Sequence, residues 1–221
     1  MLESMCAFIM LIQTMRMAIA LFEGVEELDA IGPYEVLRSA EALGGKLSTD
    51  LVSLEAGNCV RTFYGMEICN LPSFSTEIRW DVVIIPGGGW ISGRQTGIRR
   101  TIREGIWQDR LRQMHAEGTI MAGICTGVFL LGAAGLLRER AATTHHDVWA
   151  ELNNYGARPV RKRVVDTGSV ITAGGIACGI DLAFWLVERF LGSRLAKQTE
   201  ERLEYRRQGH VIKIPCPTAH C

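Results

Sequence analysis

The sequence predicts an α/β fold with a mostly parallel central sheet, and two observations predict it. Short apolar runs alternate with helical patterns along the 221 residues, which is the order of βαβ units around a parallel sheet. The clearest run, residues 81–85, is branched and apolar after Asp81 and ends at Pro86 and three glycines, as expected of a strand buried on both faces. The length and a hydrophobic share of 48% suit one substantial core and not two comfortable domains.

The elements follow in a regular order, and turn residues separate them. Gly44 and Gly45 end the first helical pattern, and Gly65 marks a hairpin turn. The expected strands are residues 17–22, 50–54, 81–85, 119–124 and 142–144, with hairpins over 60–68 and 163–173. The expected helices are residues 27–43, 98–117, 126–134, 147–153, 176–191 and 193–207.

We expect one domain, over residues 17–207, between two flanking segments. The apolar run over 5–12 resembles an export signal, but Glu3 precedes it and the run is too short to span a bilayer. Cleavage after Ala20 would also cut the first strand. We therefore interpret residues 1–16 as an extension or a misassigned start, with Met15 or Met17 as the natural beginning. Residues 208–221 contain two prolines and are expected to be a loosely held tail.

The charge and cysteine content exclude several classes of protein. Twenty-four basic and twenty-four acidic residues cancel, so the sequence shows no electrostatic footprint for nucleic acid or an anionic membrane. Seven cysteines without framework spacing favour reduced thiols and a cytoplasmic location. Cys59 and Cys69 flank the first hairpin, where a disulfide is the alternative to free thiols. Cys216, His220 and Cys221 on the tail make a poor closed metal site, and we predict no metal.

The most informative segment is a nucleophile elbow at Cys125. The sequence Gly123-Ile124-Cys125-Thr126-Gly127 follows a predicted buried strand and opens a helix, which is the G-x-S-x-G pattern with cysteine in place of serine. Small neighbours permit so tight a turn, and the helix N-terminus behind the sulfur is expected to lower the pKa of the thiol. The alternative is one more buried cysteine in a glycine-rich core.

Two other segments are expected to meet Cys125 at the carboxyl edge of the sheet. Gly87, Gly88 and Gly89 follow a buried strand, and their exposed amides would stabilise an anion; the alternative is a simple tight turn. Asp29 stands at the start of the first helix, where a raised pKa would let it exchange a proton with the sulfur. Its alternative role is to complement the helix dipole.

At these residues the chain resembles the ThiJ/PfpI superfamily, which is related to the class I glutamine amidotransferase fold. The likeness covers roughly residues 17–207 and is greatest to isonitrile hydratases and to the amidotransferase-like domains of AraC-type regulators. The matching blocks, in family order, are LDAIGPYEVL from Leu28, IIPGGG from Ile84, GICTGVFLLGAAGLL from Gly123, ATTHH from Ala142, ITAGGIACGIDLAFWLV from Ile171 and LEY from Leu203. The long cysteine block makes the match specific.

The resemblance implies a flavodoxin-like three-layer sandwich that is usually a homodimer and holds neither metal nor organic cofactor. It implies that Cys125 is the nucleophile and Asp29 its acidic partner. The backbone amides of Gly88 and Thr126 would form the anion pocket, with His145 as an accessory residue. The isonitrile hydratases carry threonine after the cysteine, as here, whereas the PfpI-type proteases carry histidine. His146 replaces a tryptophan common in the hydratases.

The resemblance implies one main hypothesis and two alternatives. The main one is hydration of an isonitrile, a small electrophile, to an N-substituted formamide through a thioimidate on Cys125. The first alternative is glutathione-independent conversion of a reactive dicarbonyl, as in glyoxalases and deglycases. The second is a non-catalytic redox or ligand sensor. Sensors of this kind carry a C-terminal helix-turn-helix region, for which the sequence after residue 207 leaves no room, so we expect no binding of DNA.

Overall fold

The computed structural model describes residues 14–55, 57–93 and 95–215, and its centre is a mixed sheet of seven strands in the order β11-β9-β10-β6-β5-β1-β2. The parallel strands are β1 (Met15–Leu21), β2 (Leu47–Ser53), β5 (Val82–Ile85), β6 (Ile120–Ile124) and β10 (Val170–Ala173). The strands β9 (Val164–Asp166) and β11 (Ile212–Lys213) are parallel to each other and antiparallel to the rest. The predicted mostly parallel sheet is confirmed.

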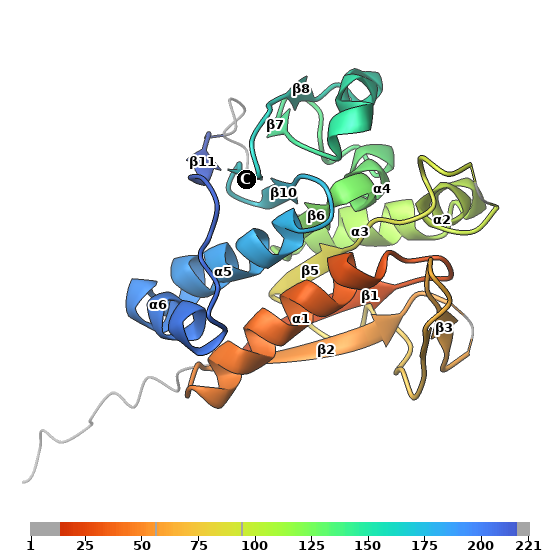
Figure 1. The fold of residues 1–221 in the computed structure, drawn as a ribbon. Coiled ribbons are helices and arrows are strands. Elements are labelled where there is room, and N and C mark those ends of the chain that lie inside the picture. The colour runs from red at the N-terminus through yellow and green to blue at the C-terminus, as the bar shows by residue number, and fades with distance from the viewer. Residues whose placement is uncertain (1–13, 56, 94, 216–221) are drawn as a thin grey trace, which may run out of the picture.

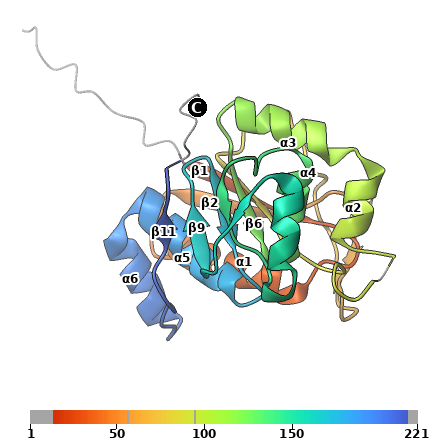
Figure 2. The same ribbon diagram turned by 90° about the horizontal axis from the view of Figure 1, so that it is seen from above.

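Helices cover both faces of this sheet (Figures 1 and 2). One face carries α1 (Glu27–Ala42), α5 (Cys178–Leu191) and α6 (Ser193–Arg202), which pack on one another. The other face carries α2 (Ile98–Glu104), α3 (Trp107–Ala116) and α4 (Val128–Ala133). The three-layer α/β sandwich is therefore confirmed. No helix within the described part of the chain is long and apolar enough to cross a membrane.

The smaller elements lie at the rim of the sandwich. The strands β3 (Val60–Arg61) and β4 (Glu67–Ile68) form the predicted hairpin, and β7 (Ala141–Ala142) pairs with β8 (Arg158–Pro159). A 3₁₀ helix, η2 (His146–Tyr155), replaces the helix expected over 147–153.

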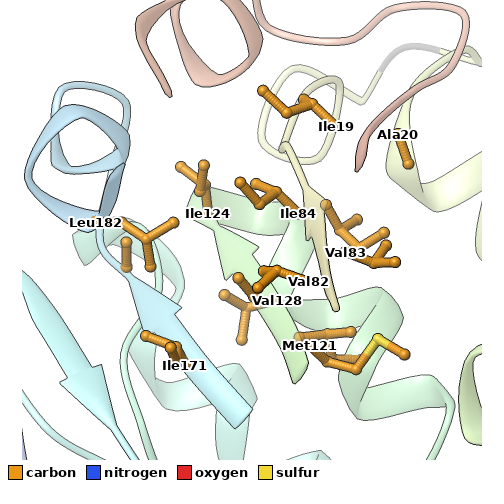
Figure 3. Close-up of a cluster of buried hydrophobic side chains, with 14 of the residues drawn as sticks. Ile19, Ala20, Val82, Val83, Ile84, Met121, Ile124, Val128, Ile171 and Leu182 are labelled. Atoms are coloured by element: carbon orange, nitrogen blue, oxygen red, sulfur yellow. The ribbon is translucent and has the colours of Figure 1, made fainter. Parts of the chain in front are cut away.

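The core sits where the central strands meet the helices of both layers (Figure 3). Ile19, Ile84, Ile124 and Ile171 come from four adjacent strands and are fully buried. Burial of one such side chain stabilises the fold by about 1.5–3 kcal/mol. Because strands of a parallel sheet are covered on both faces, their sequences are continuous apolar runs, and these runs located β5 and β6 correctly.

The predicted helix over 98–117 is wrong, because Gly105 divides it. Gly105 has a φ of +72° and ends α2, and α3 begins at Trp107. The break turns Trp107 inward, where its ring packs edge-on against Phe74 at 5.2 Å between centroids.

The prediction of free thiols at Cys59 and Cys69 is also wrong. The pairing of β3 with β4 brings their Cα atoms to 4.0 Å, and the two sulfurs form a disulfide. Because disulfides are typical of oxidising compartments, the cysteine content no longer supports a cytoplasmic location.

The two ends of the predicted domain also differ from the prediction. The first strand begins at Met15, two residues earlier than expected. The tail is not loosely held throughout, because β11 joins the sheet beside β9. The apolar run over 5–12 and the tail residues Cys216, His220 and Cys221 lie outside the described residues.

Candidate active site

The predicted elbow at Cys125 is present in the structure. Cys125 follows β6 directly and has a φ of +53°, a left-handed conformation that is uncommon for a residue with a side chain. A 3₁₀ turn, η1 (Cys125–Gly127), then leads into α4. Neighbouring segments hold the strained backbone: the Cys125 N–H donates to the Gly174 carbonyl at 3.0 Å, and the Thr144 hydroxyl donates to the Cys125 carbonyl at 2.6 Å.

Asp29 lies beside Cys125, as the position of the first helix predicted. Its side chain is fully buried in the first turn of α1 and interacts with the Cys125 thiol. The Gly87 N–H donates to Asp29 Oδ2 at 2.9 Å. The other carboxyl oxygen, Oδ1, is buried without a hydrogen-bond partner among the described residues. A buried carboxyl group with one unpaired oxygen next to a thiol is suited to exchange a proton with it.

The electrostatics of this pair differ from the prediction for the sulfur. Burial raises the pKa of Asp29 well above its usual range, which was expected. Burial also raises the pKa of the Cys125 thiol, and the negative charge of Asp29 raises it further. Hydrogen bonds from the backbone N–H groups of Ile176 and Thr126 act in the opposite direction but are outweighed. The predicted low thiol pKa is therefore wrong, because burial and a neighbouring carboxylate outweigh the helix N-terminus.

The glycine loop after β5 connects Asp29 to the elbow. A Cβ at Gly87 would lie 2.8 Å from Asp29 Oδ2 and 2.7 Å from Thr126 Oγ1, so only glycine fits between these side chains. The Gly88 N–H donates to Thr126 Oγ1 at 3.1 Å, so this amide holds the Thr126 side chain. Gly89 has a φ of +71° and packs against the backbone of Thr96.

A cavity of about 240 Å³, which we name the thiol cavity, opens beside Cys125. Phe63, Trp90 and Ile176 supply apolar walls, and His145 lines its rim. Trp90 is fixed because its ring stacks on Phe129 and its Nε1–H donates to Glu151. The cavity therefore offers one reactive sulfur in a small and largely apolar space.

Sequence reasoning missed three contributors to this site. Glu26 lines the cavity one helical turn before Asp29, and burial raises its pKa. The Ile176 amide reaches the sulfur because Ile176 has a φ of +32°, a value no sequence pattern indicated. Thr144 donates a hydrogen bond to the Cys125 carbonyl. In the sequence, only its position next to His145 indicated that it belongs to the site.

One group near the cavity has metal-ligating chemistry. His145, His146 and Asp147 bring potential ligand atoms within 4.8 Å of one another. The three residues are consecutive, and His146 and Asp147 are exposed. A site with these properties offers few fixed ligands, and the prediction of no metal stays a prediction.

The fold and site define a class of α/β proteins that present a thiol on a strand-to-helix turn. A family model described as the DJ-1/PfpI family matches residues 15–189, so the chain belongs to the DJ-1/PfpI family. Isonitrile hydratase from Pseudomonas putida is 34% identical over 186 residues, which are 84% of this chain and 76% of that protein. A deglycase from Pyrococcus abyssi is 26% identical over 161 residues, 72% of this chain and 89% of that protein.

Solved structures agree on the fold. A ThiJ/PfpI family protein from Pseudomonas syringae superimposes with a TM-score of 0.77 at 24% identity, covering 88% of this chain and 76% of that chain. At this identity the likeness establishes the architecture and not the activity.

Proposed function

We propose that this protein is an enzyme that hydrates an isonitrile to an N-substituted formamide at Cys125. One observation carries the proposal: the sulfur of a strained elbow faces a small apolar cavity, with a buried carboxyl group beside it. The similarity to the Pseudomonas putida isonitrile hydratase supports the same reaction.

The first step of the proposed mechanism uses Asp29 as a proton carrier. Because the pKa of Cys125 is raised, the thiol keeps its proton until a substrate arrives. As the sulfur attacks the terminal carbon of R–N≡C, the Asp29 carboxyl group, whose raised pKa favours its protonated form, gives its proton to that carbon and takes the thiol proton in its place. One C–S bond and one C–H bond form, giving the thioimidate R–N=CH–S–Cys125. The amides of Thr126 and Ile176 stabilise the negative charge on the sulfur during the transfer.

The second step releases the product and restores the thiol. A water molecule adds to the thioimidate carbon, and one of its protons passes through Asp29 to the nitrogen. The C–S bond then breaks, the remaining hydroxyl proton returns to the sulfur, and the formamide R–NH–CHO leaves. The same carboxyl group acts both as acid and as base in each step.

The size of the thiol cavity favours a small substrate. Ligand cavities for drug-sized molecules usually exceed about 300 Å³, whereas this one has about 240 Å³. A peptide substrate would need a long groove, so the cavity agrees better with a small electrophile than with a protease substrate.

Turnover of alkyl and aryl isonitriles, followed by the appearance of formamide in NMR spectra, tests the proposal. We expect Cys125→Ser to reduce turnover to the background rate, because no thioimidate forms. Asp29→Asn should lower kcat by about 10²–10⁴-fold, the usual contribution of a positioned acid–base group. Asp109→Asn is the matched control, because that carboxylate is exposed and bound to Arg112, and its activity should equal that of the wild type.

Two results would contradict the hydration reaction and identify an alternative. Lactate formation from methylglyoxal without glutathione, together with no reaction of any isonitrile, indicates dicarbonyl conversion. If neither substrate class reacts and a Cys125→Ser strain loses a regulatory response, the protein is a sensor. Intact-protein mass spectrometry after exposure to each electrophile separates these outcomes, since it reports the mass and position of every adduct.

The proposal also covers the oligomeric state, the partners and the location of the enzyme. We propose a homodimer that binds neither nucleic acid nor membranes. The Cys59–Cys69 disulfide is evidence against the cytoplasmic location that the cysteine count had favoured. Light scattering of the purified protein tests the dimer, and fractionation of the source cells tests the location.

A further inference from the structure

A second cavity, of about 480 Å³, lies next to the thiol cavity. The two cavities share His145 and Ile176, whose side chains therefore stand between them. A Cβ at Gly175 would lie 2.5 Å from His145 Cδ2, so this glycine permits the close packing of the histidine ring in the shared wall. A molecule that passes over this wall would contact both cavities.

The lining of this second cavity, which we name the basic cavity, is strongly positive. Arg161, Lys162 and Arg163 line it, and no aspartate or glutamate is among its described lining residues. The chain as a whole has a formal net charge of zero, so this excess is local. Two acids lie beside the cavity. Asp181 is paired with Arg163 at 2.6 Å, and Asp147, which is exposed, lies 3.0 Å from the His146 ring and 3.6 Å from the His145 ring.

Two of the three basic side chains have no ion-pair partner within the described part of the chain. Arg161 lies over the ring of Trp149, with 5.0 Å from Cζ to the centroid, and this contact orders the guanidinium group. Lys162 is exposed. Residues 174–178 around the start of α5 complete the lining, so the positive end of that helix faces the same space. Unpaired cations, an ordered guanidinium group and a helix N-terminus together favour an anionic oxygen group.

We propose that the substrate of Cys125 carries an anionic oxygen group, a carboxylate or a phosphate, which binds in the basic cavity while its reactive carbon lies at the sulfur. This inference rests on the proposed function and narrows it to isonitriles with a charged end. The thiol cavity is small and apolar, so such a substrate places its apolar part there and its charge beyond His145 and Ile176.

Binding of product-shaped molecules tests the basic cavity without any turnover. Straight-chain ω-formamido carboxylates of increasing length, and their neutral methyl esters, are titrated into the wild-type protein by isothermal calorimetry. We expect the acid of the best length to bind at least about tenfold more tightly than its ester, as a charge-assisted contact requires. Arg161→Ala and Lys162→Glu should remove this preference and leave ester binding unchanged. ω-Formamidoalkyl phosphates in the same titration identify which anion is preferred.

The matched control is Lys197→Glu, because Lys197 is an exposed lysine of α6 that does not line either cavity. It should keep the preference for the acid. Equal binding of acid and ester, or a preference that survives Lys162→Glu, would overturn the inference.

Turnover of ω-isocyano carboxylates and of their esters separates this inference from the proposed function. If no isonitrile reacts while the acids still bind selectively, the proposed hydration reaction is wrong, and the inference that the basic cavity binds an anionic group is kept. If esters and acids react with equal kcat/KM and bind equally, the proposed hydration reaction is kept, and the basic cavity is not part of the substrate site.

Discussion

Asp29 and Cys125 are each costly to ionise where they lie. Both side chains are buried, and burial raises the pKa of each group. The negative charge of Asp29 raises the pKa of Cys125 further, whereas the interaction with the Cys125 thiol lowers that of Asp29. The protein therefore gives up stability to keep an acid and a thiol together. The unpaired oxygen of Asp29 points to the same conclusion, since a buried acceptor without a partner costs free energy.

The pH dependence of stability should report this cost at Asp29. The pKa of Asp29 is about 4 in the unfolded chain and is raised in the folded state. At a pH between these two pKa values, the folded protein keeps the Asp29 proton and the unfolded chain has lost it. The free energy of unfolding therefore falls as the pH rises through this window. Asp29→Asn should remove that fall, and the variant should become more stable relative to the wild type as the pH increases from 4 to 8. Urea unfolding at each pH measures the difference.

The range ends at pH 8 because the Cys125 thiol, whose pKa is also raised, adds a similar slope at higher pH. Asp109→Asn removes an exposed carboxylate and should leave the slope unchanged. A constant difference between wild type and Asp29→Asn over the whole range would show that Asp29 is not buried in the way described.

At the scale of elements, the active site depends on how closely the elbow approaches the end of β5. A Cβ at Gly127 would lie 2.2 Å from the Ile85 carbonyl oxygen and 2.3 Å from that of Pro86. The backbone of Gly127 has a φ of −59°, which any residue adopts, so the requirement for glycine there is purely steric. Because Gly127 has no side chain, the glycine loop and the elbow come together, and with them Asp29 and Cys125.

Gly127→Ala should therefore impair both stability and catalysis. The added methyl group must push η1 away from β5, which should cost about 3 kcal/mol of unfolding free energy. A displacement of about 1 Å at the sulfur should lower kcat/KM for an isonitrile by about a hundredfold.

Gly135→Ala is the matched control: a Cβ there meets no atom within 4 Å, and only its φ of +77° opposes the change. That variant should lose about 1–2 kcal/mol and keep its activity. Equal activity of the two variants would contradict this account of the elbow.

At the scale of the whole molecule, the sequence predicted the elements whose structure a short stretch of chain determines by itself. Continuous apolar runs located β5 and β6, and a small-residue motif located Cys125. The division of the helix over 98–117 could not be predicted, because glycine inside a helical pattern is often tolerated. The disulfide between Cys59 and Cys69 required the strand register of the hairpin.

The electrostatics of the site were also beyond the sequence. The raised pKa of Cys125 follows from its depth and from the position of Asp29, both of which are properties of the packed fold. The amide of Ile176 reaches the sulfur through an unusual backbone angle that its sequence neighbours do not indicate. Residue types therefore predicted which groups meet, and packing decides their charge.

The edge strand β11 illustrates the same point for the fold, because two residues are too few for a periodic signal. β11 pairs with β9, the Ile214 N–H donates to the Asp166 carbonyl at 2.9 Å, and the Lys213 ammonium lies 4.5 Å from the centroid of the Trp185 ring. These contacts cover the edge of β9, which would otherwise present unpaired backbone groups to other chains.

A chain that ends at Gly209 should therefore unfold more easily and self-associate more than one that ends at Pro215, which keeps β11. The loss of a few net hydrogen bonds predicts a decrease of about 1–3 kcal/mol in unfolding free energy, measured by urea denaturation. Size-exclusion chromatography over a range of concentrations should show larger species for the shorter chain only, since the exposed edge of β9 can pair with another copy. Activity per folded molecule should be equal in both chains, because β11 lines neither the thiol cavity nor the basic cavity. Equal stability and equal elution of the two chains would show that β11 is dispensable, and that the sheet effectively ends at β9.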